Sequence, residues 1–549
     1  MHLLKFKSRV LLLIVSALIC SCQKENTQKP GQHDNYSDIS VITEPGSEGL
    51  MEFAPQTENP YTPSNMQAAL ESLSEKNELR CEASRFNIRA THKYIKFTPA
   101  DSIQAGLLIQ DTSLILFDYP MDRKITKAGT YYRDPSLAEG QPDYQWTCVS
   151  IDKELPPGVP YEVLSELYIP EEDPELVQYY ESEFDDCITF LIEEALKLTA
   201  NYDSSESFDG LTDTVGGLKL PSKWTPAGRI RLTDNVLNTC DGLKGVKVRA
   251  HRWFETRENL TDGNGNFNVS HQFRFQVDYS IKWERKDYHI RSGRYGQAYF
   301  NGPHQRGNWD LDITTSNGIS WHYGQVHSAA FDYYYNNQTG LRTPPVNGFL
   351  GSRIAIGVFD ESNRADYRHW QRLWFGPEIR MYSNWEDGSK RTSLEQYQTT
   401  IHELSHASHF NLGHWHFRNS EDMIHESWAL GVQWSFSRLR YPMHASNYQT
   451  LQLQYALGSD QFDVVHWGER KYTPLVIDLI DNYNQRDNNA GYTDFPLDRV
   501  IGYNIRAIED ALVQKRTMEA WREQLKLYKP AGVTDVLLNE LFDNYIPLQ

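Results

Sequence analysis

The segment IHELSHASHF, residues 401–410, contains side chains whose types and spacing suit a metal ion that activates water. His402 and His406 are four residues apart, and Glu403 directly follows the first histidine. On a helix, positions i and i+4 project from one face, so both imidazoles can bind one Zn²⁺ at about 2.0–2.1 Å. Glu403 lies beside them, where its carboxylate can accept a proton from water on the metal. The pattern predicts a zinc centre in which Glu403 is the general base.

A catalytic zinc also needs a third protein ligand, while its fourth position stays open to water. His409 lies about 10 Å along the helix axis from His402, which is too far to bind the same ion. Nineteen residues separate His406 from Glu426, enough for the chain to return on a second helix packed against the first. We predict that Glu426 is the third ligand. Three nearby histidines stay open as alternatives: His414, His416 and His425.

The sequence around the motif has the pattern of a strand followed by two helices. The segment EIRMYS, residues 378–383, is predicted as a strand. Ser393 and Gln396 have the spacing of a capping box that opens the motif helix, and Gly413 suits its C-terminal end. Ser420 is predicted to cap the second helix, which carries the third ligand.

The motif, its spacing to Glu426 and the sequence ESWA that begins there resemble the gluzincin zinc metallopeptidases. The resemblance covers about residues 379–434 and implies that the three predicted ligands bind Zn²⁺, with Glu403 as general base. It also implies that EIRMYS is the edge strand along which an extended substrate lies. The ESWA form is closer to the aminopeptidase-like members. At Leu430 the chain departs from thermolysin-like members, which have an aspartate there that orients a ligand histidine.

Stabilisation of the transition state requires a donor near the developing oxyanion, and the resemblance implies a histidine or a tyrosine. The downstream segment VVHWGERKY offers His466 and Tyr472 as candidates. The expected activity is therefore zinc-dependent hydrolysis of peptide bonds, by an endo- or aminopeptidase. The main alternative is a non-catalytic surface protein that captures host protein or glycan, with a structural zinc.

The N-terminal residues have the pattern of an export signal. Basic residues precede the apolar run VLLLIVSALI, which is too short to span a bilayer as a mature helix. The next segment, ICSCQKEN, resembles a lipobox, which implies cleavage before Cys22 and acylation of that cysteine. QKEN is similar to surface-export signals of Bacteroidetes lipoproteins, which implies a place on the bacterial outer membrane or cell surface. A plain secretory signal with chance cysteines is the alternative.

Composition limits the class of partner. The chain has 549 residues, 39% of them hydrophobic and 13% aromatic, which favours several folded domains. Its formal net charge of −19 argues against a nucleic-acid partner, because a phosphate-binding surface needs clustered Lys and Arg. The expected partners are a peptide or protein substrate, glycoproteins included, and a membrane reached through the lipid anchor.

The predicted fold class is multidomain α+β. A signal peptide at 1–21 and a flexible tether at 22–58 precede an N-terminal α/β accessory domain with its linker at 59–225. Residues 226–310 resemble the small transthyretin-like β-sandwich found beside carboxypeptidases. Residues 311–549 are predicted as the zinc peptidase domain, with a sheet, the motif helix and a helical subdomain.

Four cysteines follow the signal segment: Cys81, Cys148, Cys187 and Cys240. In an oxidising compartment they can form two disulfides by three pairings, and the sequence does not choose among these. Free buried thiols are an equally open alternative.

Overall fold

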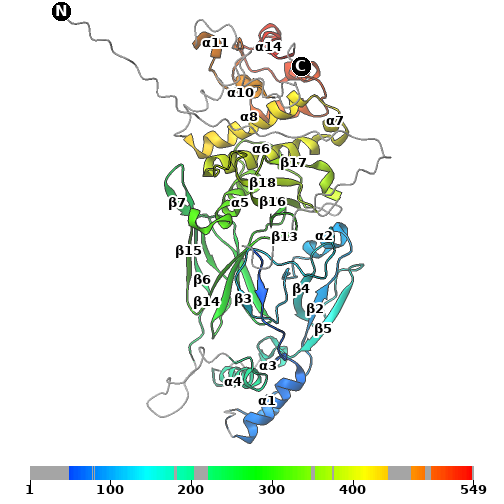
Figure 1. Ribbon diagram of the computed structural model, residues 1–549, viewed down its shortest axis with the longest axis vertical. Coiled ribbons are helices and arrows are strands. Elements are labelled where there is room, and N and C mark those ends of the chain that lie inside the picture. Colours follow the sequence, from blue (N-terminus) through cyan, green and yellow to red (C-terminus); the bar gives the residue numbers. More distant parts are fainter. Residues whose placement is uncertain are drawn as a thin grey trace, which may run out of the picture.

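The computed structural model describes residues 49–76, 78, 81–177, 182–202, 221–347, 353–373, 376–442, 472–488 and 496–546. Cys22 and His466 lie outside these ranges, so their predicted roles stay predictions. The molecule is elongated, with the N-terminal helices at one end, the sheets in the middle and the C-terminal helices at the other end (Figure 1). Several sheets and helices alternate along the chain, which confirms the predicted mixed α+β class.

The N-terminal unit combines a three-stranded antiparallel sheet with helices. Thr62 opens its first helix by accepting a hydrogen bond from the Asn65 backbone, and Pro63 occupies the first helical position, where a missing N–H is harmless. Tyr94 of the central strand and Leu191 of the last helix share one buried core. The main elements are α1 (Pro63–Glu75), β2 (His92–Phe97), α2 (Ser102–Gln110), β4 (Gln145–Ser150), β5 (Tyr161–Leu167) and α4 (Ser182–Leu198), with strand order β4-β2-β5.

Two four-stranded sheets form the middle of the molecule. Ile230 and Trp309 of one sheet and Val248 and Tyr279 of the other belong to a single buried core. The first sheet contains β6 (Ala227–Asp234), β7 (Thr239–Gly242), β10 (Asn266–Asn268) and β15 (Trp309–Ile313). The second contains β8 (Lys247–Arg252), β9 (Glu255–Leu260), β11 (Val277–Lys282) and β14 (Tyr299–Gln305).

A five-stranded sheet, which we call the site sheet, lies beneath the motif helix with the order β13-β12-β16-β18-β17. Its inner strands run parallel, which requires a crossover, and α5 (Ile319–Tyr335) provides the one between β12 and β16. The strands are β12 (Tyr288–Ser292), β13 (Gly296–Gln297), β16 (Ile354–Ser362), β17 (Asp366–Tyr367) and β18 (Ile379–Asn384).

The topology corrects the expectation about the edge strand, and it shows which strand contains the domain boundary predicted at residue 310. EIRMYS is a strand, but it is not the edge strand, because β17 pairs antiparallel with β18 at Ile379 and Arg380. The predicted division at residue 310 falls inside β15, which pairs with β6. The strands β12 and β13 come from the range predicted for the β-sandwich, yet they belong to the site sheet.

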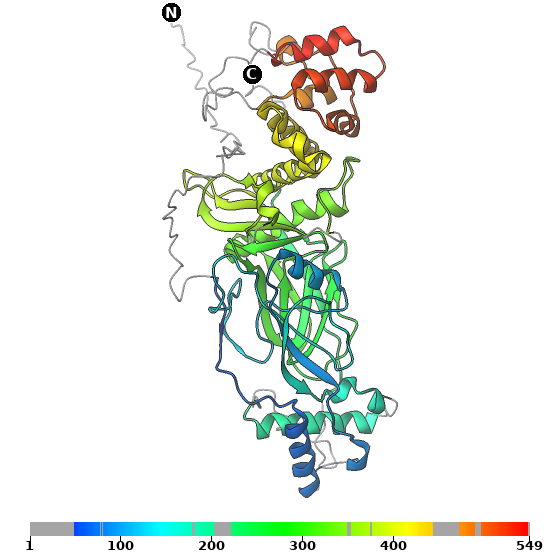
Figure 2. The same ribbon diagram turned by 90° about the vertical axis from the view of Figure 1, so that its right-hand side faces the viewer.

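Two long helices, α6 (Ser393–Leu412) and α8 (Asp422–Arg440), lie side by side above the site sheet (Figures 1 and 2). The short α7 (His414–Arg418) joins them, and Gly413 ends α6 as predicted. Buried apolar side chains from both helices meet in one core, with Leu404 from α6 and Trp428 from α8 among them. The motif helix therefore has a sheet on one side and a second helix on another.

The start of each helix differs from the sequence prediction. Thr392 caps α6 in a box with Glu395: the Thr392 hydroxyl accepts from the Glu395 N–H at 3.3 Å, and the Glu395 carboxylate accepts from the Thr392 N–H at 2.8 Å. The predicted cap, Ser393, instead donates to the Asp234 carboxylate at the end of β6. Ser420 does not cap α8, which begins after Glu421.

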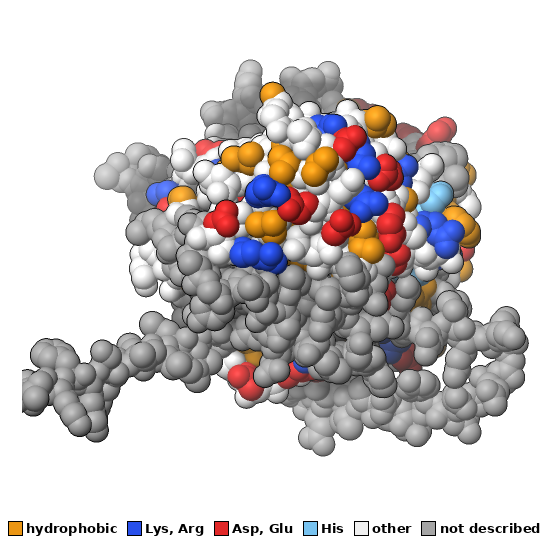
Figure 3. Space-filling model, turned by 90° about the horizontal axis from the view of Figure 1, so that it is seen from above, with side chains coloured by type: hydrophobic (Ala, Val, Ile, Leu, Met, Phe, Trp, Pro, Cys, Tyr) orange, Lys and Arg blue, Asp and Glu red, His pale blue; other side chains and the backbone are white. Residues whose placement is uncertain are grey.

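Shorter helices complete the C-terminal end: α10 (Leu475–Ile480), α11 (Gln485–Asn488), α12 (Ile505–Leu512), α13 (Met518–Leu525) and α14 (Asp535–Phe542). Seen from above, this end carries acidic and basic side chains interspersed over its described surface (Figure 3). Ion pairs join the outer elements, as Arg522 with Asp543 at 3.2 Å. Within the described ranges, no helix is both long and apolar enough to cross a bilayer.

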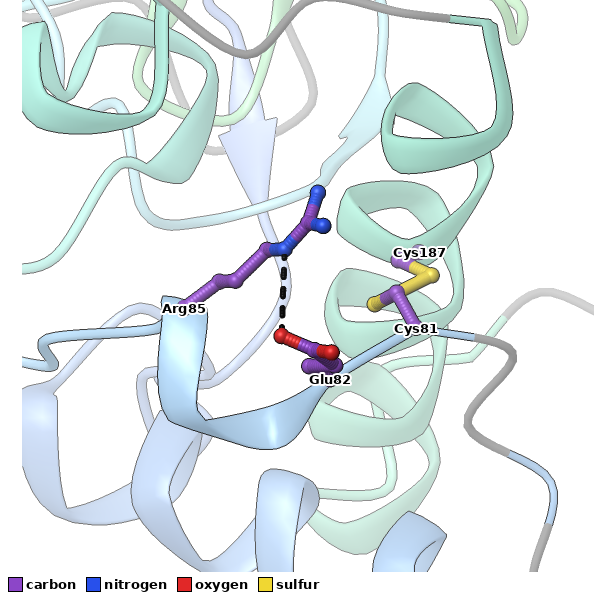
Figure 4. The surroundings of a disulfide bond; sticks show 4 residues. All are labelled: Cys81, Glu82, Arg85 and Cys187. Atoms are coloured by element: carbon purple, nitrogen blue, oxygen red, sulfur yellow. Dashed lines mark ion pairs between the residues drawn. A yellow bond between two sulfur atoms is a disulfide. The ribbon is translucent and has the colours of Figure 1, made fainter.

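A disulfide joins Cys81 to Cys187 on α4, so the structure selects one bridge from the pairings that the sequence leaves open (Figure 4). Glu82 and Arg85 form an ion pair of 3.7 Å beside it. Cys148 and Cys240 are free thiols. The bridge closes a loop of 106 residues and ties the chain after α1 to the last helix of the N-terminal unit.

We predict that Cys81→Ser destabilises the N-terminal unit by about 4–5 kcal/mol, the chain-entropy value for a loop of this length. Thermal unfolding of the purified protein measures the effect. The matched control is Cys240→Ser, which removes an unbonded, half-buried thiol and should leave the melting temperature nearly unchanged. Non-reducing peptide mapping that found Cys148 in a disulfide would contradict the assignment.

Candidate metal centre

Two helices bring three potential metal ligands together at one buried point. The Glu426 Oε2 atom on α8 lies 3.2 Å from His402 Nε2 and 3.7 Å from His406 Nε2, both on α6. The ligand atoms of the three residues all lie within 4.8 Å of one another. Donors bound tetrahedrally at 2.0–2.1 Å are about 3.3 Å apart, so the group can hold one metal ion. The predicted convergence of Glu426 with the two histidines is confirmed.

The surroundings of the alternative histidines explain why they do not join this group. His425 stacks on Phe417 with ring centroids 4.1 Å apart, and His414 stacks on Phe410 at 4.3 Å. Among the residues that the structure describes, His402, His406 and Glu426 are the one group of three His, Cys, Asp or Glu residues whose ligand atoms come this close. None of the three alternative histidines belongs to it.

The two histidines differ in their hydrogen bonds. Both ring nitrogens of His406 are buried, and neither has a hydrogen-bond partner in the described part of the chain. A buried polar atom without a partner destabilises a protein by about 1–3 kcal/mol. A metal ion at Nε2 would use that lone pair, so the protein side of this site fits a metal.

The charge state of Glu426 also suits a ligand. Its side chain is 2% exposed, and burial alone would raise the carboxyl pKa. The charge interaction with His406, followed by the contact with His402, outweighs burial and lowers that pKa well below its usual value. Glu426 is therefore ionised at neutral pH, as metal binding requires.

Gln433 contacts one of the three potential ligands. Its Oε1 atom lies 3.1 Å from His402 Nδ1, and when this nitrogen donates to Gln433 the Nε2 lone pair is available for a metal ion. Gln433 follows Glu426 by seven residues, which is two turns along the same face of α8. Sequence reasoning looked for this partner at position 430, where Leu430 stands, and missed Gln433; the i+7 spacing was the available signal.

The structure also shows where Glu403, Tyr472 and His409 lie relative to the metal group. Glu403 is fully buried on α6, directly after the first ligand. The ring of Tyr472 lies 6.4 Å from the His402 ring, so the chain returns to the site just before α10. His409 packs against Phe417 and is outside the metal group, as its distance along α6 predicted. Burial, followed by its histidine neighbours, lowers the pKa of His409 and keeps it neutral.

Comparisons with known proteins add no family assignment. No model of a known protein family matches this chain. A search of curated proteins found no match to it either. The chemistry of the site therefore rests on its own residues and geometry.

We predict that Glu426→Ala weakens metal binding by more than about 100-fold, because loss of a ligand should exceed loss of an orienting partner. Metal content after dialysis, measured by atomic absorption, tests this. Asp422→Ala, in the first turn of the same helix, is the control and should retain metal. Unchanged metal content in Glu426→Ala would remove Glu426 from the site.

We predict that Gln433→Leu weakens metal binding by about 10–100-fold, because His402 loses the acceptor that fixes its tautomer. Gln433→Glu keeps an acceptor in place and should bind metal nearly as well as the parent protein. Competition with a chromophoric chelator measures both affinities. Equal affinities for the Leu variant and the parent would show that Gln433 does not orient His402.

Proposed function

We propose that the protein is a zinc-dependent metallopeptidase of the gluzincin type. The observation that carries this proposal is the buried convergence of two imidazoles and one carboxylate, with Glu403 next to the first ligand. Two nitrogen donors and one oxygen donor are a common set for catalytic zinc, which leaves its fourth position to water or substrate.

When bound, Zn²⁺ supplies a Lewis acid and lowers the pKa of its water to about 7. His402, His406 and Glu426 would hold the ion in place, and Gln433 would fix the ring of the first histidine. Glu403 accepts a proton from the attacking water and delivers it to the leaving amine, acting first as base and then as acid. Its burial beside the ligands suits both steps because it excludes bulk water.

A donor to the oxyanion completes the proposed machinery. Tyr472 is a candidate because its ring lies beside the His402 ring. His466 is proposed from the sequence alone. Either side chain would donate a hydrogen bond to the oxygen that becomes negative in the transition state.

The site sheet suggests where a peptide substrate lies. The outer strand β17 is two residues long, runs antiparallel to β18 and lies against α6. An extended peptide that added to this edge would run beside the motif helix, with its backbone N–H and C=O groups paired to the sheet. We propose a peptide or protein substrate, glycoproteins included, for an enzyme anchored to the cell surface through acylated Cys22.

A surface-binding protein with a structural metal is the second candidate, and burial favours it, since the ligands are only 1–2% exposed. Structural zinc sites usually close with four protein ligands. In the described ranges, no fourth His, Cys, Asp or Glu joins this group. Three ligands beside a buried glutamate favour catalysis over a structural role.

We predict that Glu403→Gln retains zinc and loses peptidase activity by about 10²–10⁴-fold, because the amide cannot accept the proton. Turnover of a peptide library by the zinc-loaded variant, with metal content measured in parallel, tests the role. Glu386→Gln, an exposed carboxylate between β18 and α6, is the matched control and should cleave normally. Full activity in Glu403→Gln would contradict the proposal, and cleavage that persists with a chelator would contradict zinc dependence.

A further inference from the structure

The face of the site sheet that points away from the motif helix is unusually polar. Side chains alternate along a strand, so neighbouring residues point to opposite faces. On β12, the Tyr288 hydroxyl lies 3.1 Å from His327 on α5, which marks the helix-covered face. His289 and Arg291 therefore point to the opposite face, where the N-terminal unit packs. A buried sheet face is normally apolar, so charged residues here require an explanation.

A cavity of about 100 Å³ separates this face from the N-terminal unit. It is lined by residues of α2, by the segment around Asp143 and by residues of β12, β13 and β16. Gln141 is exposed and lies in the lining, so the cavity reaches solvent there. At about 30 Å³ for each water molecule in the liquid, this volume corresponds to about three water molecules, or to one small organic molecule.

Six charged side chains line the cavity, and their formal charges sum to zero. Three are basic and three are acidic: Arg133, Arg291, Arg353, Asp118, Asp143 and Glu378. They come from separate parts of the chain, so only the folded protein brings them together. A ligand with a net charge would add an uncompensated charge to this balanced set, which is unfavourable in a buried site.

Burial acts against the charged forms of an acidic and a basic group in this cavity. Asp143 is paired with Arg133 at 2.6 Å, yet burial raises the pKa of Asp143 to about 6. Burial also lowers the pKa of Arg291, although Asp143 and Glu378 act in the opposite direction. Arg353 bonds Glu284 at 2.7 Å through one terminal nitrogen, while its Nε atom is buried without a hydrogen-bond partner in the described part of the chain. A bound carboxylate would give the Arg353 Nε atom an acceptor, and a bound ammonium group would offset the effect of burial on Asp143.

We propose that the cavity binds a small zwitterion, an α-amino acid with a short side chain. Its carboxylate would lie against Arg291 and Arg353, where planar guanidinium groups suit a carboxylate. Its ammonium group would lie against Asp143. Arg291 interacts electrostatically with both Arg353 and Asp143, so the basic and acidic parts are close enough for one small molecule. The site sheet lies between this cavity and the metal centre, so the proposal stands without the peptidase assignment.

Calorimetric titration of the purified full chain with L-alanine, acetate and methylammonium tests the proposal. We expect saturable binding of L-alanine, at least about tenfold tighter than binding of either single-charge probe. Equal affinity for acetate and L-alanine would overturn the proposal in favour of a simple anion site. No saturable binding at about 10 mM L-alanine would overturn it in favour of a water-filled interface.

Variants of the cavity residues test whether L-alanine binds at this place in the fold. Arg291→Gln and Asp143→Asn should each weaken L-alanine binding by about tenfold or more, whereas Asp143→Asn should not weaken acetate binding, because it removes a negative charge. The matched control is Arg294→Gln, since Arg294 is half-exposed beyond the end of β12 and pairs with Glu139. Circular dichroism and metal content show which variants fold. One folded cavity variant is enough to test whether L-alanine binds in this cavity. Parental affinity for L-alanine in a folded cavity variant would overturn the proposal.

Discussion

The structure depends on one constraint: two imidazoles and a carboxylate are buried in contact between α6 and α8. Such a group is unfavourable inside a protein unless its lone pairs and charge are used, because buried polar atoms lose their water. His402 contacts Glu426 through one ring nitrogen and Gln433 through the other, so its polar atoms have partners. The ring nitrogens of His406 have no hydrogen-bond partner in the described part of the chain, and a metal ion between the two helices would use the Nε2 lone pair.

Two aspartates fix the register of these helices and therefore the geometry of the ligands. Asp234 accepts hydrogen bonds from Ser393 at the start of α6 and from Tyr441 directly after α8. Asp332 on α5 accepts from Tyr397 of α6 at 3.0 Å, and it pairs with Arg440 near the end of α8 at 3.4 Å. Because the start of one helix and the end of the other share these partners, α6 and α8 run antiparallel.

Close packing on the far side of α8 holds this helix, which carries Glu426, in place. A Cβ atom at Gly431 would come within 2.2 Å of Val476 on α10, so only glycine allows these helices to approach so closely. Ser427 and Thr473 add a buried hydrogen bond of 2.7 Å near the same contact. His402, His406 and Glu426 therefore lie between elements that are themselves tightly packed, which limits how far these three side chains can move apart.

Much of the site, but less of the fold, could be predicted from the sequence. The i, i+4 histidines and the returning helix with Glu426 follow from helical periodicity, which is a local property. The cap of α6 was predicted one residue late, because Thr392 and Ser393 can both cap and the choice depends on Asp234, far away in the sequence. Long-range contacts also determine the membership of β12 in the site sheet and the role of Gln433. A two-residue strand such as β17 leaves no recognisable pattern, so the edge of the sheet was misplaced.

X-ray absorption at the zinc K-edge of the purified, zinc-loaded protein measures the metal group most directly. Binding by His402, His406 and Glu426 predicts a shell of only nitrogen and oxygen donors at about 2.0–2.2 Å, with the outer-shell scattering of two imidazoles. A sulfur shell at about 2.3 Å, or the signal of fewer than two imidazoles, would contradict the assignment.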